Sequence, residues 1–209
     1  MTVPIPKHET RRLKVLWQYE VLDTVPEEVF DDLADLAANI CDAPIALISL
    51  VDEDRQWFKA RTGITISETS RDISFCAHAI LDDELLVVPD ATKDKRFKNN
   101  PLVTGPQKIR FYAGAPLIAP GGHALGTLCV LDNKPRPLRP EQAQALEVLA
   151  RHVVSQLELR RHARELTQVR ESGQQQRTEL VRAKAEIARL RAALARYEKQ
   201  PSPGKRLRR

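Results

Sequence analysis

A heptad repeat runs through the C-terminal part of this 209-residue chain and constrains its fold more than any other feature. One apolar position recurs every seven residues, and a second follows it three residues later. The predicted seam contains Leu159, Leu166, Val169, Leu180, Ile187, Leu190 and Leu194. Because only a partner helix covers such a stripe, the sequence predicts a coiled coil over residues 159–198.

The charges beside the seam predict how the two helices are oriented. Acidic residues stand at the g position of three heptads, and basic residues stand at the e position five residues later. The pairs are Glu165 with Arg170, Glu179 with Lys184, and Glu186 with Arg191. In a parallel pair each g residue meets the e residue of the next heptad on the other chain, so all three contacts attract. The sequence therefore predicts a parallel homodimer.

Two adjacent seam positions are poorly suited to packing. Gly173 occupies an a position and Gln176 the following d position. A glycine inside a helix costs about 1 kcal/mol relative to alanine, and at a seam it also leaves its layer unfilled. We expect a soft point here, which is either a place where the paired helices change register during signalling or a hinge without such a role.

Charge divides the chain into two unlike parts. Residues 160–209 carry 15 Lys/Arg and 5 Asp/Glu, whereas residues 1–159 carry 18 Lys/Arg and 23 Asp/Glu. Two prolines and a terminal basic cluster predict a disordered basic tail over residues 199–209. Such a tail serves solubility, or it contacts nucleic acid or an acidic protein surface. Prolines and polar residues predict that residues 1–8 are disordered as well.

Composition limits the class of protein. Three cysteines are too few for a disulfide framework and indicate a reducing compartment. No apolar run approaches the roughly 20 residues of a membrane span, and the N-terminus has no apolar signal region. We therefore expect a cytoplasmic protein without a membrane partner. Residues 9–158 have the usual length of a single domain, which is enough to bury a hydrophobic core.

The pattern of residues 9–158 predicts helices and hairpin-linked strands. Helical spacing from Leu13 to Glu20 predicts an N-terminal helix that ends near Asp23, and further helices are predicted from Pro26 to before Pro44 and over 74–81. Residues 94–102 are predicted to form a short helix or irregular segment that ends at Pro101. Apolar or alternating runs predict strands over 45–51, 55–61, 85–88, 109–117 and 123–131, with a loop over 62–73 and a long helix from Pro140. Hairpins flanked by helices indicate an α+β fold with an antiparallel sheet.

Seven short segments follow one another in a familiar order. They are Leu22–Thr24, Phe30–Leu33, Ile45–Asp52, Arg55–Phe58, Ser74–Ile80, Arg110–Leu117 and Leu125–Val130. Together they resemble the GAF domain family, in the subgroup found in bacterial signalling proteins, over about residues 9–160. The resemblance implies a GAF (PAS-like) sheet flanked by helices. Members of that family bind cyclic nucleotides, haem, bilins, metals, small acids or no known ligand, and one relative reduces free methionine sulfoxide, so the cofactor stays unknown.

The resemblance places a ligand between the sheet and the segments that cover it. Gly114 and Gly126 stand at mid-strand positions, which often mark the close approach of a ligand or of backbone. An Arg and a Tyr over a glycine floor suit an anionic or planar ligand. The predicted ligand-binding residues are Phe75, Cys76, His78, Asp90, Arg110 and Tyr112. Alternatively, Arg110 pairs with an acidic neighbour and the glycines allow tight packing.

Cys76 and His78 form the most specific local pattern, Cys-x-His. The pattern fits either a redox thiol beside an imidazole or two ligands of one metal ion. Side chains two residues apart on a helix point in divergent directions, so we expect no metal site. The alternative is a buried thiol and a histidine that caps a carbonyl. Bilin-binding relatives place His directly after Cys, whereas Ala77 intervenes here, so we do not expect a covalently attached bilin. Haem bound by His78 or His123 alone is a further alternative.

Thiol catalysis depends on a second cysteine. The methionine sulfoxide reductase relatives use pocket cysteines as nucleophile and resolver. In this sequence Cys76 alone is expected near the pocket, Cys129 is expected to pack in the core, and no cysteine follows Asp90 in the covering segment. We therefore expect no catalytic residues and no enzyme activity.

These observations predict a GAF sensory or regulatory domain followed by a parallel dimeric coiled coil. We expect the domain to bind a small molecule or a partner and to relay a helix movement to a downstream signalling protein. The output then acts in trans, or the chain is part of a longer protein. Two alternatives are a dimerisation and docking module that senses nothing, and a thiol-dependent enzyme resembling methionine sulfoxide reductase.

Overall fold

The structure, a computed structural model, describes residues 3–198. Its elements in chain order are α1 (Glu9–Gln18), α2 (Glu28–Cys41), β1 (Ile45–Val51), β2 (Arg55–Thr62), β3 (Glu68–Ser70), the 3₁₀ helix η1 (Arg71–Ile73), α3 (Cys76–Ala79), β4 (Leu86–Val88), α4 (Pro101–Thr104), β5 (Phe111–Ala119), β6 (His123–Asp132) and α5 (Pro140–Glu198). The chain divides into two units, Met1–Arg161 and His162–Arg209, three residues after the predicted boundary. The predicted tail, residues 199–209, lies outside the described residues.

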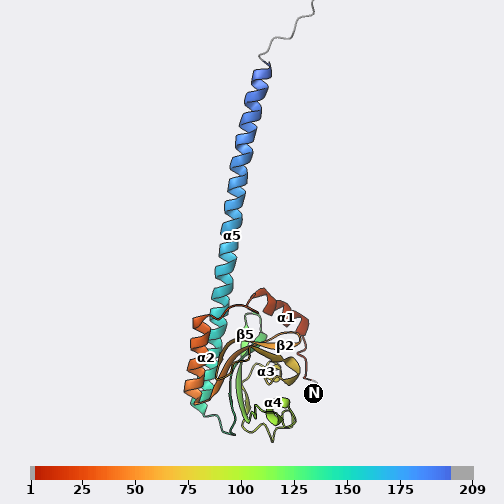
Figure 1. The fold of residues 1–209 in the computed structure, drawn as a ribbon, viewed down its shortest axis with the longest axis vertical. Helices are drawn as coiled ribbons and strands as arrows, with labels where there is room; N and C mark the ends of the chain where they lie inside the picture. The colour runs from red at the N-terminus through yellow and green to blue at the C-terminus, as the bar shows by residue number, and fades with distance from the viewer. Residues whose placement is uncertain (1–2, 199–209) are drawn as a thin grey trace, which may run out of the picture. The chain divides into compact units, whose positions relative to one another are not determined.

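The strands form one antiparallel sheet in the order β3-β2-β1-β6-β5-β4 (Figure 1). Two hairpins, β1-β2 and β5-β6, meet at the centre, where Ile48 of β1 stands opposite Leu128 of β6. Gly121 and Gly122 turn the second hairpin with φ angles of 97° and 77°, a region in which an L side chain is strained. The predicted α+β fold is confirmed.

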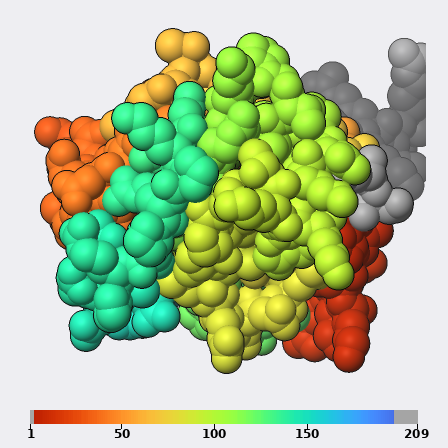
Figure 2. Space-filling view, turned by 90° about the horizontal axis from the view of Figure 1, so that it is seen from below, coloured from red at the N-terminus to blue at the C-terminus, as the bar shows by residue number. Residues whose placement is uncertain are grey.

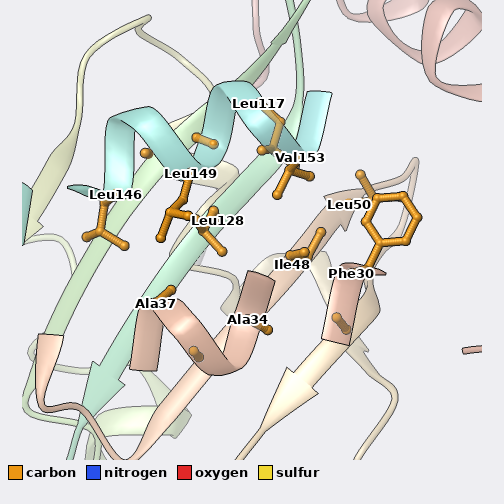
Figure 3. Packing of buried hydrophobic residues seen from close by; sticks show 14 of the residues in the cluster. Phe30, Ala34, Ala37, Ile48, Leu50, Leu117, Leu128, Leu146, Leu149 and Val153 are labelled. Carbon is orange, nitrogen blue, oxygen red and sulfur yellow. The ribbon is translucent and has the colours of Figure 1, made fainter. Parts of the chain in front are cut away.

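One face of the sheet is covered by α2 and the first part of α5, which lie side by side (Figures 1 and 3). The contributing side chains recur every three or four residues along each helix, so they share one side. They are Phe30, Ala34 and Ala37 from α2 and Leu146, Leu149 and Val153 from α5, above Ile48, Leu50, Leu117 and Leu128 of the sheet. Each large side chain buried here stabilises the fold by roughly 1.5–3 kcal/mol.

The opposite face carries a second cluster of buried side chains, because successive strand residues point to opposite sides. Leu47, Tyr112 and Cys129 belong to it, together with residues of α3 and α4. In Figure 2 the yellow and yellow-green atoms of the segment from α3 to α4 occupy the centre of the view, and the orange atoms of α2 lie to the left of them. Val3 also packs against this cluster, so the predicted disordered N-terminus includes a packed side chain.

Two local predictions were wrong. The segment 62–73, predicted as a loop, contains β3 and η1, and β3 pairs with β2 so that Glu68 stands opposite Trp57. Pro101 begins α4 and does not end a helix, because the Asn100 side chain caps that helix by accepting a hydrogen bond from Leu102 N at 2.8 Å. A proline is tolerated in the first turn, where its missing N–H would have no partner in the helix.

Candidate functional site

An aromatic stack occupies the predicted ligand site between the sheet and α3. The rings of Phe75 and Phe97 lie 4.1 Å apart at 14°, and the rings of Phe75 and Tyr112 lie 5.2 Å apart at 27°. All three side chains are buried, with exposed fractions of at most 2%. Four of the six predicted residues gather here, namely Phe75, Cys76, Tyr112 and, through an edge contact of 4.8 Å with Phe97, His78. These side chains therefore fill the space that the sequence analysis assigned to a ligand.

The mid-strand glycines have two different neighbours. A Cβ on Gly114 would lie 2.1 Å from the hydroxyl oxygen of Tyr112, so the glycine lets that ring fold down over its own strand. A Cβ on Gly126 would lie 1.9 Å from the carbonyl oxygen of Ser49 on the neighbouring strand. The close approach predicted from the sequence is therefore present at both positions, and a side chain and backbone provide it.

Arg110 and Asp90 lie away from the stack. The Arg110 guanidinium donates to the carbonyl oxygens of Val103 at 2.8 Å and Ile109 at 3.0 Å, which ties the segment around α4 to the start of β5. Asp90 accepts hydrogen bonds from the backbone and hydroxyl of Thr92 and pairs with Lys93 at 3.1 Å. The structure therefore does not bring these two charged groups to the predicted ligand site, and the proposed acidic neighbour of Arg110 is replaced by carbonyl groups.

His78 lies at the outer edge of the same region. It borders a half-open hollow of about 440 Å³ that Leu86, Arg96 and Pro4 also line. Burial lowers the pKa of His78, and the nearby Arg96 charge lowers it further, so the imidazole stays neutral at physiological pH. Cys76 is buried, whereas His78 is only partly buried, which agrees with the divergence expected of residues two apart. Among the described residues no group of three metal-ligating side chains occurs.

A buried polar cluster lies under α3 and was missed in the sequence. The Ser74 hydroxyl donates to Gln56 Oε1 and accepts from Ala77 N at 3.0 Å. Gln56 in turn donates through Nε2 to the hydroxyl of Thr69 at 2.7 Å, and Ser49 donates to Gln56 Oε1 at 3.4 Å. Because each of these buried groups has a partner, the cluster fixes α3 against β1 and β2 at little desolvation cost.

Two cysteines meet beneath Tyr112. The Cys76 and Cys129 sulfur atoms lie 3.8 Å apart, and the Tyr112 hydroxyl lies 3.6 Å from the Cys76 sulfur. The expectation that Cys76 stands alone at the site was therefore wrong. Cys129 is in the core, as expected, but its side chain points to the same side of the sheet as Tyr112. The third cysteine, Cys41, belongs to the cluster on the other face.

The Glu27 carboxylate connects the sheet to α5. Glu27 accepts hydrogen bonds from Lys59 Nζ of β2 at 2.6 Å and from Arg160 Nε of α5 at 2.9 Å. The buried Lys59 ammonium also donates to Thr24 Oγ1 and to the Val25 carbonyl. We call Glu27, Lys59 and Arg160 the Glu27 bridge. Burial raises the pKa of Glu27, but the hydrogen bonds from Lys59 and Arg160 outweigh it, and the pKa is lowered.

The predicted seam residues on α5 are exposed in the single chain. Their exposed fractions are 61% for Leu159, 71% for Leu166 and Val169, 55% for Leu180, 49% for Ile187, 61% for Leu190 and 58% for Leu194. Nothing lies within 4 Å of the position that a Cβ on Gly173 would occupy. A row of exposed large apolar side chains on one helix is typical of a surface that another chain covers.

The fold and this site define a GAF domain. The family model described as GAF domain matches residues 25–157, and the chain belongs to that family. None of the helices among residues 3–198 combines the length and apolar character that crossing a bilayer requires.

Comparisons with known proteins extend this picture. A cyclic di-GMP phosphodiesterase of Pseudomonas aeruginosa is 45% identical over 157 residues, which cover 75% of this chain and 27% of that protein. The chain therefore spans little more than a quarter of that relative. The GAF domain of a phosphoenolpyruvate-protein phosphotransferase from Coxiella burnetii matches with a TM-score of 0.56 at 18% identity, over 77% of this chain and 99% of that one.

A second similar solved structure is a type II free methionine-R-sulfoxide reductase from Thermoplasma acidophilum. It matches with a TM-score of 0.52 at 11% identity, over 62% of this chain and 90% of that one. At the low identities of these two solved structures, each match shows a shared fold alone. The family and the Pseudomonas aeruginosa relative together support a signalling GAF domain.

Proposed function

We propose that this GAF protein is a regulatory signalling module that forms a parallel homodimer through residues 159–198 and relays conformational change along α5. The observation that carries the proposal is the exposed seam on α5, where seven large apolar side chains are each 49–71% exposed. Covering them removes apolar surface from water at roughly 25 cal/mol per Å², and a second copy of the same helix supplies a matching stripe.

Two neighbouring residues on α5 provide a matched test of dimerisation. Leu180 lies on the seam and Val181 lies beside it, and both are exposed, at 55% and 67%. We expect Leu180→Glu to raise the dimer dissociation constant roughly a hundredfold, because each copy loses a buried apolar group and gains a buried charge. Val181→Glu should leave the constant unchanged. Sedimentation equilibrium measures both, and equal effects of the two substitutions would contradict the seam.

The place of α5 in the domain supports the proposed relay. Leu146, Leu149 and Val153 near the start of this helix belong to the core on the sheet, and the Glu27 bridge holds Arg160 to Lys59 of β2. A shift of β2 or α2 would therefore change the contacts of α5 at the start of the proposed pairing region. A signal requires only that the paired helices have two states and that the ligand or partner binds one state more tightly than the other.

The input is proposed to act on the aromatic stack. A small planar ligand enters this layer only if Phe75 or Phe97 moves, because their rings fill the space in the described structure. The filled layer also favours a second candidate function, a dimerisation and docking module without a ligand. Native mass spectrometry of protein purified from its host separates the two. A retained small mass supports the sensor, and a bare dimer that binds a signalling protein supports the docking module.

The signalling context is proposed from the relative. The Pseudomonas aeruginosa protein is named a cyclic di-GMP phosphodiesterase, and the match covers 27% of it. We therefore propose a cytoplasmic regulatory role in signalling of that kind, with output from a downstream protein or a further part of the same polypeptide. The phosphodiesterase reaction itself is not proposed for this chain.

A further inference from the structure

A pair of thiols lies in the second core cluster, and the proposed relay does not use it. The sulfur atoms of Cys76 in α3 and Cys129 in β6 are 3.8 Å apart, although 53 residues separate them in the chain. Both residues are buried, at 2% and 0% exposure. Two free cysteines therefore face each other across the contact between α3 and the sheet.

The surroundings of the pair make the two sulfurs unequal. Burial raises the pKa of Cys76, but hydrogen bonds, first from Cys129 and also from Tyr112, outweigh burial and lower the pKa. Burial first, and then the neighbouring Cys76, raise the pKa of Cys129. The pair therefore titrates as a unit in which Cys76 is the more acidic of the two sulfurs. A thiolate attacks oxidants far faster than a thiol does.

We propose that Cys76 and Cys129 form a reversible redox pair that a small hydroperoxide converts into a disulfide within the domain. The Cys76 thiolate attacks one peroxide oxygen, the O–O bond breaks, and the departing alkoxide or hydroxide takes a proton from water. The resulting sulfenic acid on Cys76 is then attacked by the Cys129 sulfur. The S–S bond forms, and the hydroxyl group leaves with the Cys129 proton as water. In total two thiols are oxidised by two electrons and one peroxide is reduced.

The position of the pair selects the oxidant and connects oxidation to the fold. Because both sulfurs are buried, hydrogen peroxide fits the site better than a bulky disulfide such as oxidised glutathione. Bond formation requires the sulfurs to close from 3.8 Å to about 2 Å. α3 has only four residues, so we expect a small shift of its Cys76 end toward β6 when the bond forms. Oxidation would then join the cover of the aromatic stack covalently to the sheet.

Intact mass spectrometry of the full chain tests the proposal. The chain is treated with hydrogen peroxide at native pH, quenched with catalase, alkylated in denaturant and weighed without reductant. We expect a loss of about 2 Da, a fall in alkylatable thiols from three to one, and full reversal by dithiothreitol. Peptide mapping should link Cys76 to Cys129. Addition of 16 or 32 Da without a linked peptide, or a bridge that involves Cys41, would overturn the proposal.

Matched variants separate the pair from general thiol oxidation. Cys41→Ala should still lose about 2 Da, because burial raises the pKa of Cys41 to about 11 and its sulfur lies in the other cluster. Cys129→Ala should lose the 2 Da change and retain a sulfenic acid on Cys76 that dimedone traps. If that variant does not fold, the linked peptide in the wild-type chain decides alone. Comparable oxidation by oxidised glutathione would contradict the access argument.

Discussion

Replacing Glu27 with glutamine tests whether the Glu27 bridge stabilises the domain. The Lys59 side chain is fully buried, whereas the Glu27 side chain is 33% exposed. Glutamine keeps the shape of glutamate but removes its charge. The buried Lys59 ammonium then retains two neutral acceptors, Thr24 Oγ1 at 3.0 Å and the Val25 carbonyl at 2.8 Å, and Arg160 loses its ion pair.

The expected cost follows from this burial. Removing one partner of a fully buried ion pair costs roughly 3–5 kcal/mol. Water reaches Glu27, and the two remaining acceptors partly satisfy Lys59, so we expect Glu27→Gln to lower the free energy of unfolding by about 2 kcal/mol. For a domain of this size that corresponds to a melting temperature about 4–8 °C lower.

Urea unfolding at pH 7, followed by tryptophan fluorescence, measures this difference. Glu28→Gln is the matched control, because Glu28 is the exposed neighbour at the start of α2, and its free energy should change by less than about 0.5 kcal/mol. The reasoning would be refuted if Glu27→Gln stayed within that same margin.

The Glu27 bridge also predicts that the stability difference between wild type and Glu27→Gln depends on pH. The pKa of Glu27 is lower in the folded state than in the unfolded chain, where it is about 4.3. The bridge therefore contributes its full stability above that value, and the contribution disappears as the pH falls through the folded pKa. The difference between wild type and Glu27→Gln should shrink in acid, and a constant difference down to pH 3 would contradict the assignment.

Three further substitutions test separate parts of the structure. Gly126→Ala should lower the free energy of unfolding by more than about 2 kcal/mol in urea, because its Cβ would lie 1.9 Å from the Ser49 carbonyl oxygen. Gly173→Leu should raise the helical melting transition seen by circular dichroism, because it fills an empty a position; an unchanged transition would remove that residue from the seam. Arg12→Met should cost about 2 kcal/mol, because the buried Arg12 guanidinium donates to the Val51 carbonyl at 2.7 Å, and a neutral result by urea unfolding would contradict that role.

The sequence predicts the central elements well and the edges poorly. β1 was predicted over Ile45–Val51, as observed, because an uninterrupted apolar run marks a strand buried on both faces. β3 was missed because Glu68–Ser70 has no hydrophobic period and is held as a strand only by its pairing with β2. α4 was misplaced because the capping role of Asn100 is a local hydrogen bond that proline spacing alone does not reveal.

The sequence predicted some residues of the candidate site and missed others, because some of its contacts depend on tertiary packing. Phe75, Cys76 and Tyr112 were assigned to one layer from the resemblance and from strand parity, and the structure places them together. Arg110 was assigned to the same face as Tyr112, but it precedes β5, and its long side chain reaches carbonyl groups instead. The contact of Cys129 with Cys76 depends on how α3 sits on β6, which no local pattern encodes.

A distance between spin labels on the two copies tests the parallel dimer most directly. We place one label at Arg196→Cys, an exposed position near the end of the described helix, in a chain whose Cys41, Cys76 and Cys129 are replaced by alanine. Facing helices lie 8–10 Å apart, so a parallel pair predicts a label separation below about 30 Å at micromolar protein. An antiparallel pair would separate the labels by roughly 50 Å at a rise of 1.5 Å per residue. A distance of that length, or no measurable coupling between labels, would contradict the account.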